Sequence, residues 1–155
     1  MYFDKFDTFN KNNTKHFLSG IVLIMENKIL LVHPTKFKDK PYKWSIPKGH
    51  NETDMSDLET AITELEEEAN IKIHPHKLEN SINGVLNYSK GAKNKELKYY
   101  VLIINRNELD FKLYNNMILR YFLDKLEISE AGFFSKNEAV DLIEEQQKPL
   151  LKFLS

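Results

Sequence analysis

The regular part of the chain begins with two apolar runs separated by a short polar turn. HFLSGIVLIM at 16–25 predicts a buried strand, and KILLVH at 28–33 predicts its hairpin partner. The basic loop PTKFKDKPYK follows at 34–43, and WSI at 44–46 predicts a short strand. Pro47 ends that strand, because proline lacks the N–H that a sheet ladder needs.

A helix is expected over 57–69, where the apolar positions take up a helical spacing. Ser56 and Glu59, three residues apart, form a capping-box pattern at its start. Asn70 marks its end, because asparagine tolerates the left-handed conformation in which helices stop. The face that should pack on the core carries Leu58, Ala61, Ile62, Leu65 and Ala69.

The pattern after this helix returns to strands. Residues 71–74 predict a short strand, and SINGVLNY at 81–88 and KELKYYVLII at 95–104 predict two longer ones joined by the lysine-rich loop SKGAKNK. The segment 105–126 is ambiguous, because MILRYFLDKL within it fits either a short helix or a bent strand.

The last third of the chain completes an alternation of strands and helices. EAGFFS at 130–135 predicts a strand, KNEAVDLIEEQ at 136–146 a helix, and PLLKFL at 149–154 an amphipathic turn. This alternation implies an α/β or α+β fold in which helices pack on a sheet. We expect one domain over 16–155, preceded by a poorly defined polar lead-in at 1–15.

Composition narrows the functional classes. The 155 residues carry a net charge of −1, which gives no general attraction to nucleic acid or membrane. The absence of cysteine excludes disulfides, thiolate metal sites and a cysteine nucleophile. The longest apolar run, Ile21 to Met25, is far too short to span a membrane, and the first residues lack the pattern of a signal peptide. We therefore expect a cytoplasmic protein.

The predicted helix and the loop before it are unusually acidic. Eight carboxylates and no lysine or arginine lie between Gly49 and Glu68. On a helical wheel, Glu64, Glu67 and Glu68 fall within an arc of about 100° beside the apolar stripe. Negative charge in the last turns of a helix costs about 0.3–1 kcal/mol per group, and a hard divalent cation such as Mg²⁺ would relieve it. A solvated helix face is the competing interpretation.

Two lysine clusters accompany the acidic segment. The first, at 36–48, holds five lysines against Asp39 alone, and the second, at 90–98, lies in the predicted hairpin loop. Lysines that face a metal-loaded acidic site would suit a polyphosphate substrate. Their competing interpretation is solubility.

The acidic segment resembles the Nudix box, G-x5-E-x7-R-E-U-x-E-E-x-G-U, in which U is aliphatic. Met55, Thr63 and Asn70 depart from this pattern. The resemblance implies a Nudix α/β/α sandwich, with a mixed sheet between helices, that hydrolyses a nucleoside diphosphate linked to another moiety with Mg²⁺ or Mn²⁺. The positions that match are Gly49, Glu64, Leu65, Glu67, Glu68 and Ile71.

Carried over by position, the resemblance also implies roles for individual residues. Glu67 and Glu68 would be metal ligands, and Glu64 would be a further ligand or the base that orients the attacking water. A main-chain carbonyl at Lys48 or Gly49 would complete the coordination.

Other positions follow from the family less directly. Family members often add a glutamate before the last sheet strand, for which Glu127 is the better candidate and Glu130 the second. Met55 and Thr63 replace both partners of the family's Glu–Arg pair together, so no buried charge is left alone.

The lead-in PKGH, with DLETA and EEA, resembles the dinucleoside polyphosphate branch, such as the diadenosine tetraphosphate hydrolases. Lys48 and Lys43 are our candidates to hold phosphates, and Tyr88 and Tyr121 our candidates to stack on a base. Two alternatives remain open. One is a 5′-RNA pyrophosphohydrolase or decapping enzyme, for which the basic loops would guide the strand, and the other is a degenerate, non-catalytic nucleotide-binding module.

Overall fold

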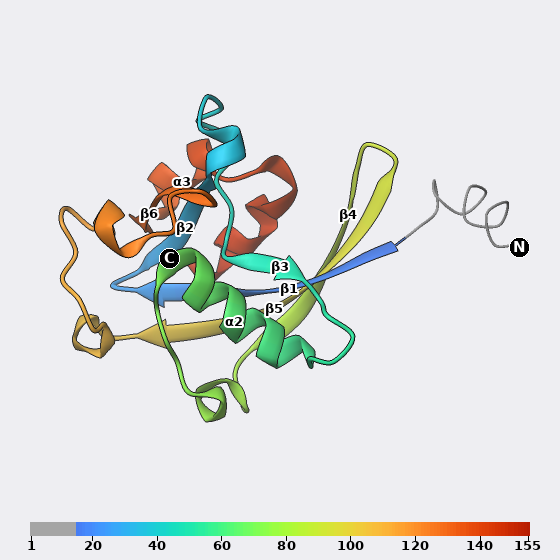
Figure 1. Cartoon of the computed structure of the whole chain (residues 1–155), viewed down its shortest axis with the longest axis horizontal. Helices are drawn as coiled ribbons and strands as arrows, with labels where there is room; N and C mark the ends of the chain where they lie inside the picture. Colours follow the sequence, from blue (N-terminus) through green and yellow to red (C-terminus); the bar gives the residue numbers. More distant parts are fainter. Residues whose placement is uncertain (1–14) are drawn as a thin grey trace, which may run out of the picture.

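The computed structural model describes residues 15–155, which form one mixed sheet between two helical layers (Figure 1). The expected lead-in at 1–15 lies, apart from Lys15, outside the described residues. The sheet order is β4-β5-β1-β2-β6, and β3 pairs with β1 beside this path. The strands are β1 (Lys15–Met25), β2 (Lys28–Pro34), β3 (Lys48–His50), β4 (Asn83–Lys90), β5 (Lys93–Ile104) and β6 (Ile128–Phe134).

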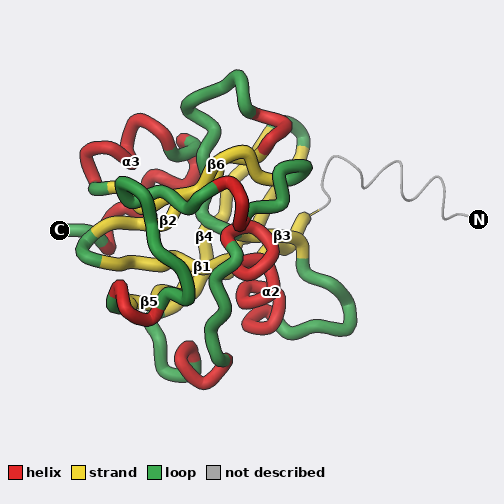
Figure 2. Tube along the Cα trace, turned by 60° about the vertical axis from the view of Figure 1, so that its left-hand side comes forward, coloured by secondary structure: helices red, strands yellow, loops and turns green. Residues whose placement is uncertain are grey.

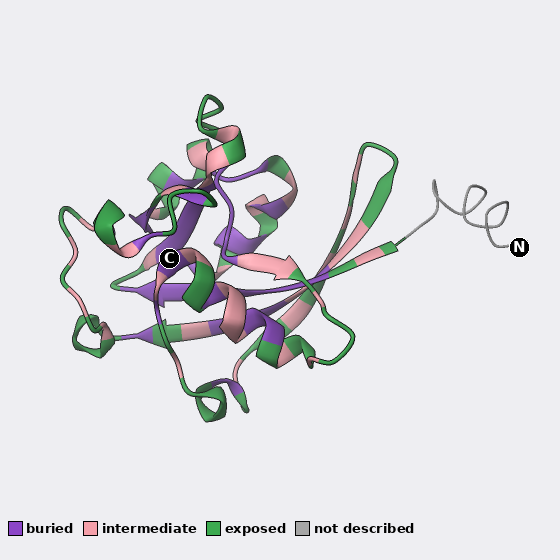
Figure 3. Cartoon of the chain, viewed as in Figure 1, coloured by how far each residue is buried: buried purple, intermediate pink, exposed green. Residues whose placement is uncertain are grey.

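The central strand β1 is paired on both sides. It runs parallel to β5 along its whole length, from Lys15 opposite Asn94 to Met25 opposite Ile104. On its other side it pairs antiparallel with β2 at the turn and with β3 further along. Both edges of β1 are therefore paired, and because helices also cover both of its faces, most of the strand is buried (Figure 3).

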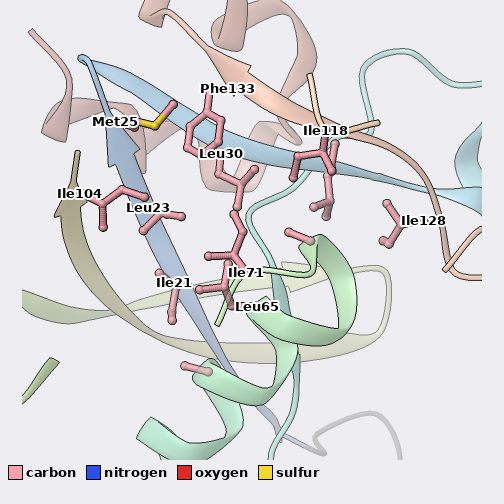
Figure 4. Close-up of a cluster of buried hydrophobic side chains, with 14 of the residues drawn as sticks. Ile21, Leu23, Met25, Leu30, Leu65, Ile71, Ile104, Ile118, Ile128 and Phe133 are labelled. Carbon is pink, nitrogen blue, oxygen red and sulfur yellow. The ribbon is translucent and has the colours of Figure 1, made fainter. Parts of the chain in front are cut away.

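Alternate side chains of β1 enter two different cores. Ile21 and Leu23 face α2 (Asp57–Ala69) and pack with Leu65 (Figure 4). Val22 and Ile24 face the opposite layer. That layer consists of α3 (Lys136–Leu142) and the 3₁₀ segment η6 (Glu145–Phe153).

Figure 2 shows α2 and α3 on opposite sides of the sheet. The expected α/β/α sandwich is therefore confirmed. No helix among residues 15–155 is both long and apolar enough to cross a membrane.

The start and end of α2 follow the sequence pattern. The Ser56 hydroxyl accepts from the Glu59 N–H at 3.1 Å, and the Glu59 carboxylate accepts from the Ser56 N–H at 3.0 Å. Asn70 has φ 58° and ψ 31°, and its N–H donates to the Glu66 carbonyl. The acidic helix is therefore fixed at both ends by local side-chain chemistry.

The predicted strands at 44–46 and 71–74 are wrong. Trp44 and Ser45 make only isolated bridges, to Ile143 and Val32, and the strand forms after Pro47 as β3. The Ile46 N–H is taken by the Gln147 side chain instead of a ladder. Residues 71–74 form no regular structure, and His74 leads with an extended backbone into the 3₁₀ turn η3 (Pro75–Leu78).

Two further segments differ from the sequence interpretation. Within 117–126, Met117 makes two isolated bridges, to Tyr114 and Gly132. A single 3₁₀ turn, η5 (Arg120–Phe122), follows, so neither the predicted helix nor the predicted strand is present. The predicted helix at 136–146 ends at Leu142. It stops because Ile143 adopts an extended backbone and bridges Trp44, and the Glu144 N–H then donates to the Trp44 carbonyl at 2.8 Å.

Two more 3₁₀ turns complete the structure. The turn η2 (Thr35–Phe37) lies in the basic loop, and η4 (Arg106–Glu108) follows β5.

We expect Asn70→Val to destabilise the fold by about 1–2 kcal/mol, because a β-branched side chain is strained at positive φ. Asn70→Gly should change the free energy of unfolding by less than about 1 kcal/mol. Urea denaturation measures both. The control is Asn137→Val at an exposed position inside α3, and an equal loss at both positions would show that the left-handed conformation of Asn70 is unimportant.

Candidate active site

The candidate site forms where β3 passes over the carboxylates of α2. Gly49 pairs with Ser19 of β1, and the Glu64 carboxyl lies directly against it. A methyl group on Gly49 would lie 2.6 Å from Glu64 Oε2 and closer still to the other two carboxyl atoms. The Lys48 N–H donates to Glu68 Oε1 at 3.1 Å. The glycine is therefore required for space, because the acidic side chain occupies the volume of its missing Cβ.

A cavity of about 780 Å³ opens at this point. Its walls bring together the three glutamates of α2 with Glu127, which lies in the loop before β6. The same cavity is lined by four lysines from three different parts of the chain: Lys36, Lys48, Lys90 and Lys95. Negative and positive groups far apart in sequence therefore face one open cavity.

Crowding and burial shift the proton affinities of the glutamates. Burial, followed by the charge of Glu67 and a hydrogen bond with it, raises the pKa of Glu64 to about 7. Burial and the charge of Glu64 raise the pKa of Glu68 to about 8, although Lys48 opposes this shift. Glu127 adds to both shifts. Without a cation, the site therefore retains protons at neutral pH.

The pKa of Lys48 is lowered, in contrast to those of the glutamates. Burial lowers the pKa of its ammonium, while the charges of Glu144 and Glu68 oppose that change. The ammonium of this half-buried residue is thus within the influence of two carboxylates. This position suits a group that will meet a phosphate inside the cavity.

The donor set suits Mg²⁺ or Mn²⁺. Carboxylate oxygens and a main-chain carbonyl at Gly49 are hard ligands, which both ions prefer. Within residues 15–155, no three His, Asp or Glu side chains already converge closely enough to hold an ion. Binding would therefore require rotation of at least one glutamate, and a cation would offset the burial and the repulsion that hold protons on Glu64 and Glu68.

The structure separates the two glutamates proposed before the last strand. Glu127 lines the cavity, and its carbonyl accepts from the Thr35 N–H at 2.8 Å, which fixes this loop beside η2. Glu130 lies on β6 opposite His33 and does not line the cavity. Glu127 therefore remains the better candidate.

Three of the predicted substrate contacts do not line this cavity. The Lys43 ammonium lies 5.7 Å from the Phe37 ring centroid and 5.9 Å from that of Tyr42. Tyr88 is half-buried against the second core, and burial raises its pKa to about 12. Tyr121 is 85% exposed. The substrate-binding roles of Lys43, Tyr88 and Tyr121 stay predictions. Lys48, in contrast, lines the cavity.

Several cavity residues escaped individual prediction. Lys36, Lys90 and Lys95 belong to the two lysine clusters, so their charge was the available signal. Phe37 and Glu144 gave no sequence signal, because their positions depend on how distant segments return to the site. Neither Met55 nor Thr63 lines the cavity, so their departure from the Nudix pattern removes no group from its wall.

We expect Gly49→Ala to weaken Mn²⁺ binding about tenfold or more, because the new methyl displaces the Glu64 carboxyl. The melting temperature should change little, since the end of a glutamate side chain moves easily. Calorimetric titration and thermal unfolding test this pair of effects. The control is Gly91→Ala, which meets no atom within 4 Å but is strained at φ +64°, so it should lower stability and leave Mn²⁺ affinity intact.

Metal-free protein should lose stability as pH rises from about 5 to about 8. Between the unfolded pKa of 4.5 and the raised native values, the native state binds more protons than the unfolded state, so unfolding becomes easier with rising pH. Stabilisation by Mg²⁺ should grow over the same window, because the ion binds the deprotonated carboxylates. Thermal unfolding with EDTA or MgCl₂ measures both trends.

The matched variants for this pH series are Glu68→Gln and Glu66→Gln on the same helix. Glu68→Gln should reduce both the pH slope and the Mg²⁺ effect, whereas Glu66 is exposed and its replacement should change neither. Indistinguishable pH profiles for the two variants would contradict the electrostatic account of the site.

The chain matches a known protein family over most of its length and is similar to several solved structures. The family model described as NUDIX domain matches residues 15–154. An Ap4A hydrolase from C. elegans, in a binary complex, is 21% identical at a TM-score of 0.62, covering 88% of this chain and 93% of its own. A MutT NUDIX hydrolase from Burkholderia pseudomallei is 14% identical at a TM-score of 0.68, covering 92% and 99%.

A third similar structure contains bound ligands. It is a bifunctional NMN adenylyltransferase/ADP ribose pyrophosphatase from Francisella tularensis, complexed with AMP and an Mn ion. It is 18% identical at a TM-score of 0.67, and the match covers 97% of this chain and 46% of that longer protein. At these identities the likeness concerns the fold. The family match extends over nearly all the described residues, and the chain therefore belongs to the NUDIX domain family.

Proposed function

We propose that the protein hydrolyses a phosphoanhydride bond in a nucleoside polyphosphate, with a dinucleoside polyphosphate such as diadenosine tetraphosphate as its preferred substrate. The observation that carries the proposal is the meeting of the α2 glutamates and four lysines in one cavity. A polyphosphate needs both, because metal ions bridge some of its oxygens and lysines neutralise the others.

Mg²⁺ or Mn²⁺ would be held by Glu64, Glu67, Glu68 and Glu127, with the carbonyl of Gly49. When bound, the ion supplies activation of water and neutralisation of charge on the phosphate oxygens. Around it, the residues of the chain bind and orient the substrate. The Lys48 N–H fixes Glu68, and the ammonium groups of Lys36, Lys48 and Lys95 would hold the phosphates.

Glu64 is our candidate for the residue that handles the proton of the attacking water. Its carboxyl lies directly against Gly49 in the wall of the cavity, where a carboxylate can accept a proton from water. Glu67 is more exposed than Glu64 and can approach a bound substrate from the cavity mouth.

The preference for a dinucleoside substrate has support in the shape of the surface. A second hollow of about 530 Å³ shares His50 and Glu52 with the cavity, so the two are neighbours at the end of β3. A long substrate with a nucleoside at each end would extend from the cavity into this hollow. The similarity to a structure described as an Ap4A hydrolase points in the same direction.

The test is a substrate panel with Mg²⁺: diadenosine tetraphosphate, nucleoside triphosphates, ADP-ribose and RNA with a 5′-triphosphate or cap. We expect diadenosine tetraphosphate to give the highest kcat/KM. Glu67→Gln should lower kcat by about 100-fold or more, because charge stabilisation at the phosphate is lost. Glu66→Gln is the matched control, since that side chain is exposed on the same helix.

The outcomes separate the candidate functions. Turnover of RNA alone would replace the proposed substrate with a 5′ RNA end, and nucleotide binding without turnover would indicate a non-catalytic module. Unchanged activity in Glu67→Gln would remove the metal assignment.

A further inference from the structure

Glu144 is a buried carboxylate of the cavity that the proposed mechanism does not use. It is only 7% exposed, yet it lines the cavity wall between α3 and η6. Its charge acts on Lys48, Lys95 and Tyr88, whereas Glu127 acts on Glu64 and Glu68. Glu144 follows α3, whereas Glu64, Glu67 and Glu68 come from α2, so the two sets of carboxylates reach the cavity from different elements.

The backbone and a buried glutamine hold this carboxylate in place. The Glu144 N–H donates to the Trp44 carbonyl at 2.8 Å. Gln147 has no exposed surface, and its Oε1 accepts from the Ile46 N–H at 3.0 Å. That bond fixes the amide orientation, so Gln147 Nε2 donates to Ser45 Oγ at 2.9 Å and lies 3.4 Å from Glu144 Oε2. A side chain fixed in this way is preorganised to contact a ligand.

Lys90 lies beside this carboxylate. Its ammonium lies 3.0 Å from Glu144 Oε1 and 5.2 Å from the centroid of the Phe37 ring. Phe37 and Lys90 both line the cavity. An aromatic surface, a cation and a fixed carboxylate are therefore side by side.

The charge of Glu144 restricts which part of a nucleotide can lie beside it. A carboxylate accepts about four hydrogen bonds, and two partners, Lys90 and Gln147, are present in the described part of the chain. A phosphate there would meet like charge, but a neutral hydroxyl or amino group would find an acceptor. In a nucleotide these donors belong to the ribose and the base.

We propose that Glu144 is a specificity-determining residue, which accepts a hydrogen bond from a hydroxyl or amino donor of the substrate's nucleoside and so directs the phosphates toward α2. The Phe37 ring supplies apolar surface beside the same nucleoside. This inference rests on the proposed hydrolysis of a nucleotide.

The test uses the full chain with Mg²⁺ and compares diadenosine tetraphosphate with analogues that each lack one donor: the 2′-deoxy, 3′-deoxy and 6-deamino forms. In the wild type, removal of the recognised donor should raise KM about tenfold or more, as expected for a hydrogen bond to a charged group, with a small effect on kcat. The affected analogue identifies ribose or base as the partner.

Three variants assign this discrimination to Glu144. Glu144→Met should bring the KM values of parent and analogue within about twofold, because the acceptor is gone. Lys90→Met removes the ion pair but keeps the carboxylate, so discrimination should persist. Glu145→Met is the matched control, since the neighbouring Glu145 is 82% exposed and pairs with Lys148. Thermal unfolding verifies that each variant is folded.

The inference is overturned if no donor deletion changes the wild-type KM by more than twofold, a result that needs no variant. It is also overturned if Glu144→Met still discriminates, or if Lys90→Met loses discrimination equally, which would show that the ion pair merely supports the wall. Absence of any hydrolysis by the wild type would instead refute the proposed function, and this inference would fall with it.

Discussion

Repulsion among carboxylates held in a confined space is the constraint on which the candidate site depends. The Glu64 carboxyl lies against Gly49 and the Glu68 carboxylate accepts from the Lys48 N–H, so both groups lie beside β3. The fold therefore maintains charges close together that would favour separation in water. Such a locally unfavourable arrangement is typical of functional sites, where stability elsewhere in the structure compensates for it.

The surrounding sandwich makes that compensation possible. Both faces of β1 are buried, and the helix that carries the glutamates is anchored through Ala61 and Leu65, which have no exposed surface. The local hydrogen bonds of Ser56 and Glu59 fix where the helix starts, and Asn70 fixes where it stops. Because these anchors act on the apolar face and the termini, the acidic face can serve binding without contributing to folding.

Sequence reasoning succeeded where local chemistry determines the structure. The hairpin of β1 and β2, the capped helix and the residues of the acidic face all follow from spacing and residue type over short stretches. It failed at 44–46 and 71–74, because an extended apolar segment becomes a strand only if a neighbour offers a free edge, and Gln147 takes the Ile46 N–H instead. It also missed Phe37 and Glu144, since these residues reach the cavity only through the way distant segments of the chain pack together. The positive charge of each cluster identified its lysines as candidate phosphate ligands. It could not show that Lys36 lines the cavity and Lys43 does not.

The position of Gln147 and Glu144 late in the chain has a consequence for biogenesis. The wall that they form is made of residues translated after α2 and all six strands. On the ribosome, the acidic helix and the sheet are therefore synthesised while this side of the cavity is still missing. Ligand capture that uses both walls of the cavity must therefore await the segment that follows β6.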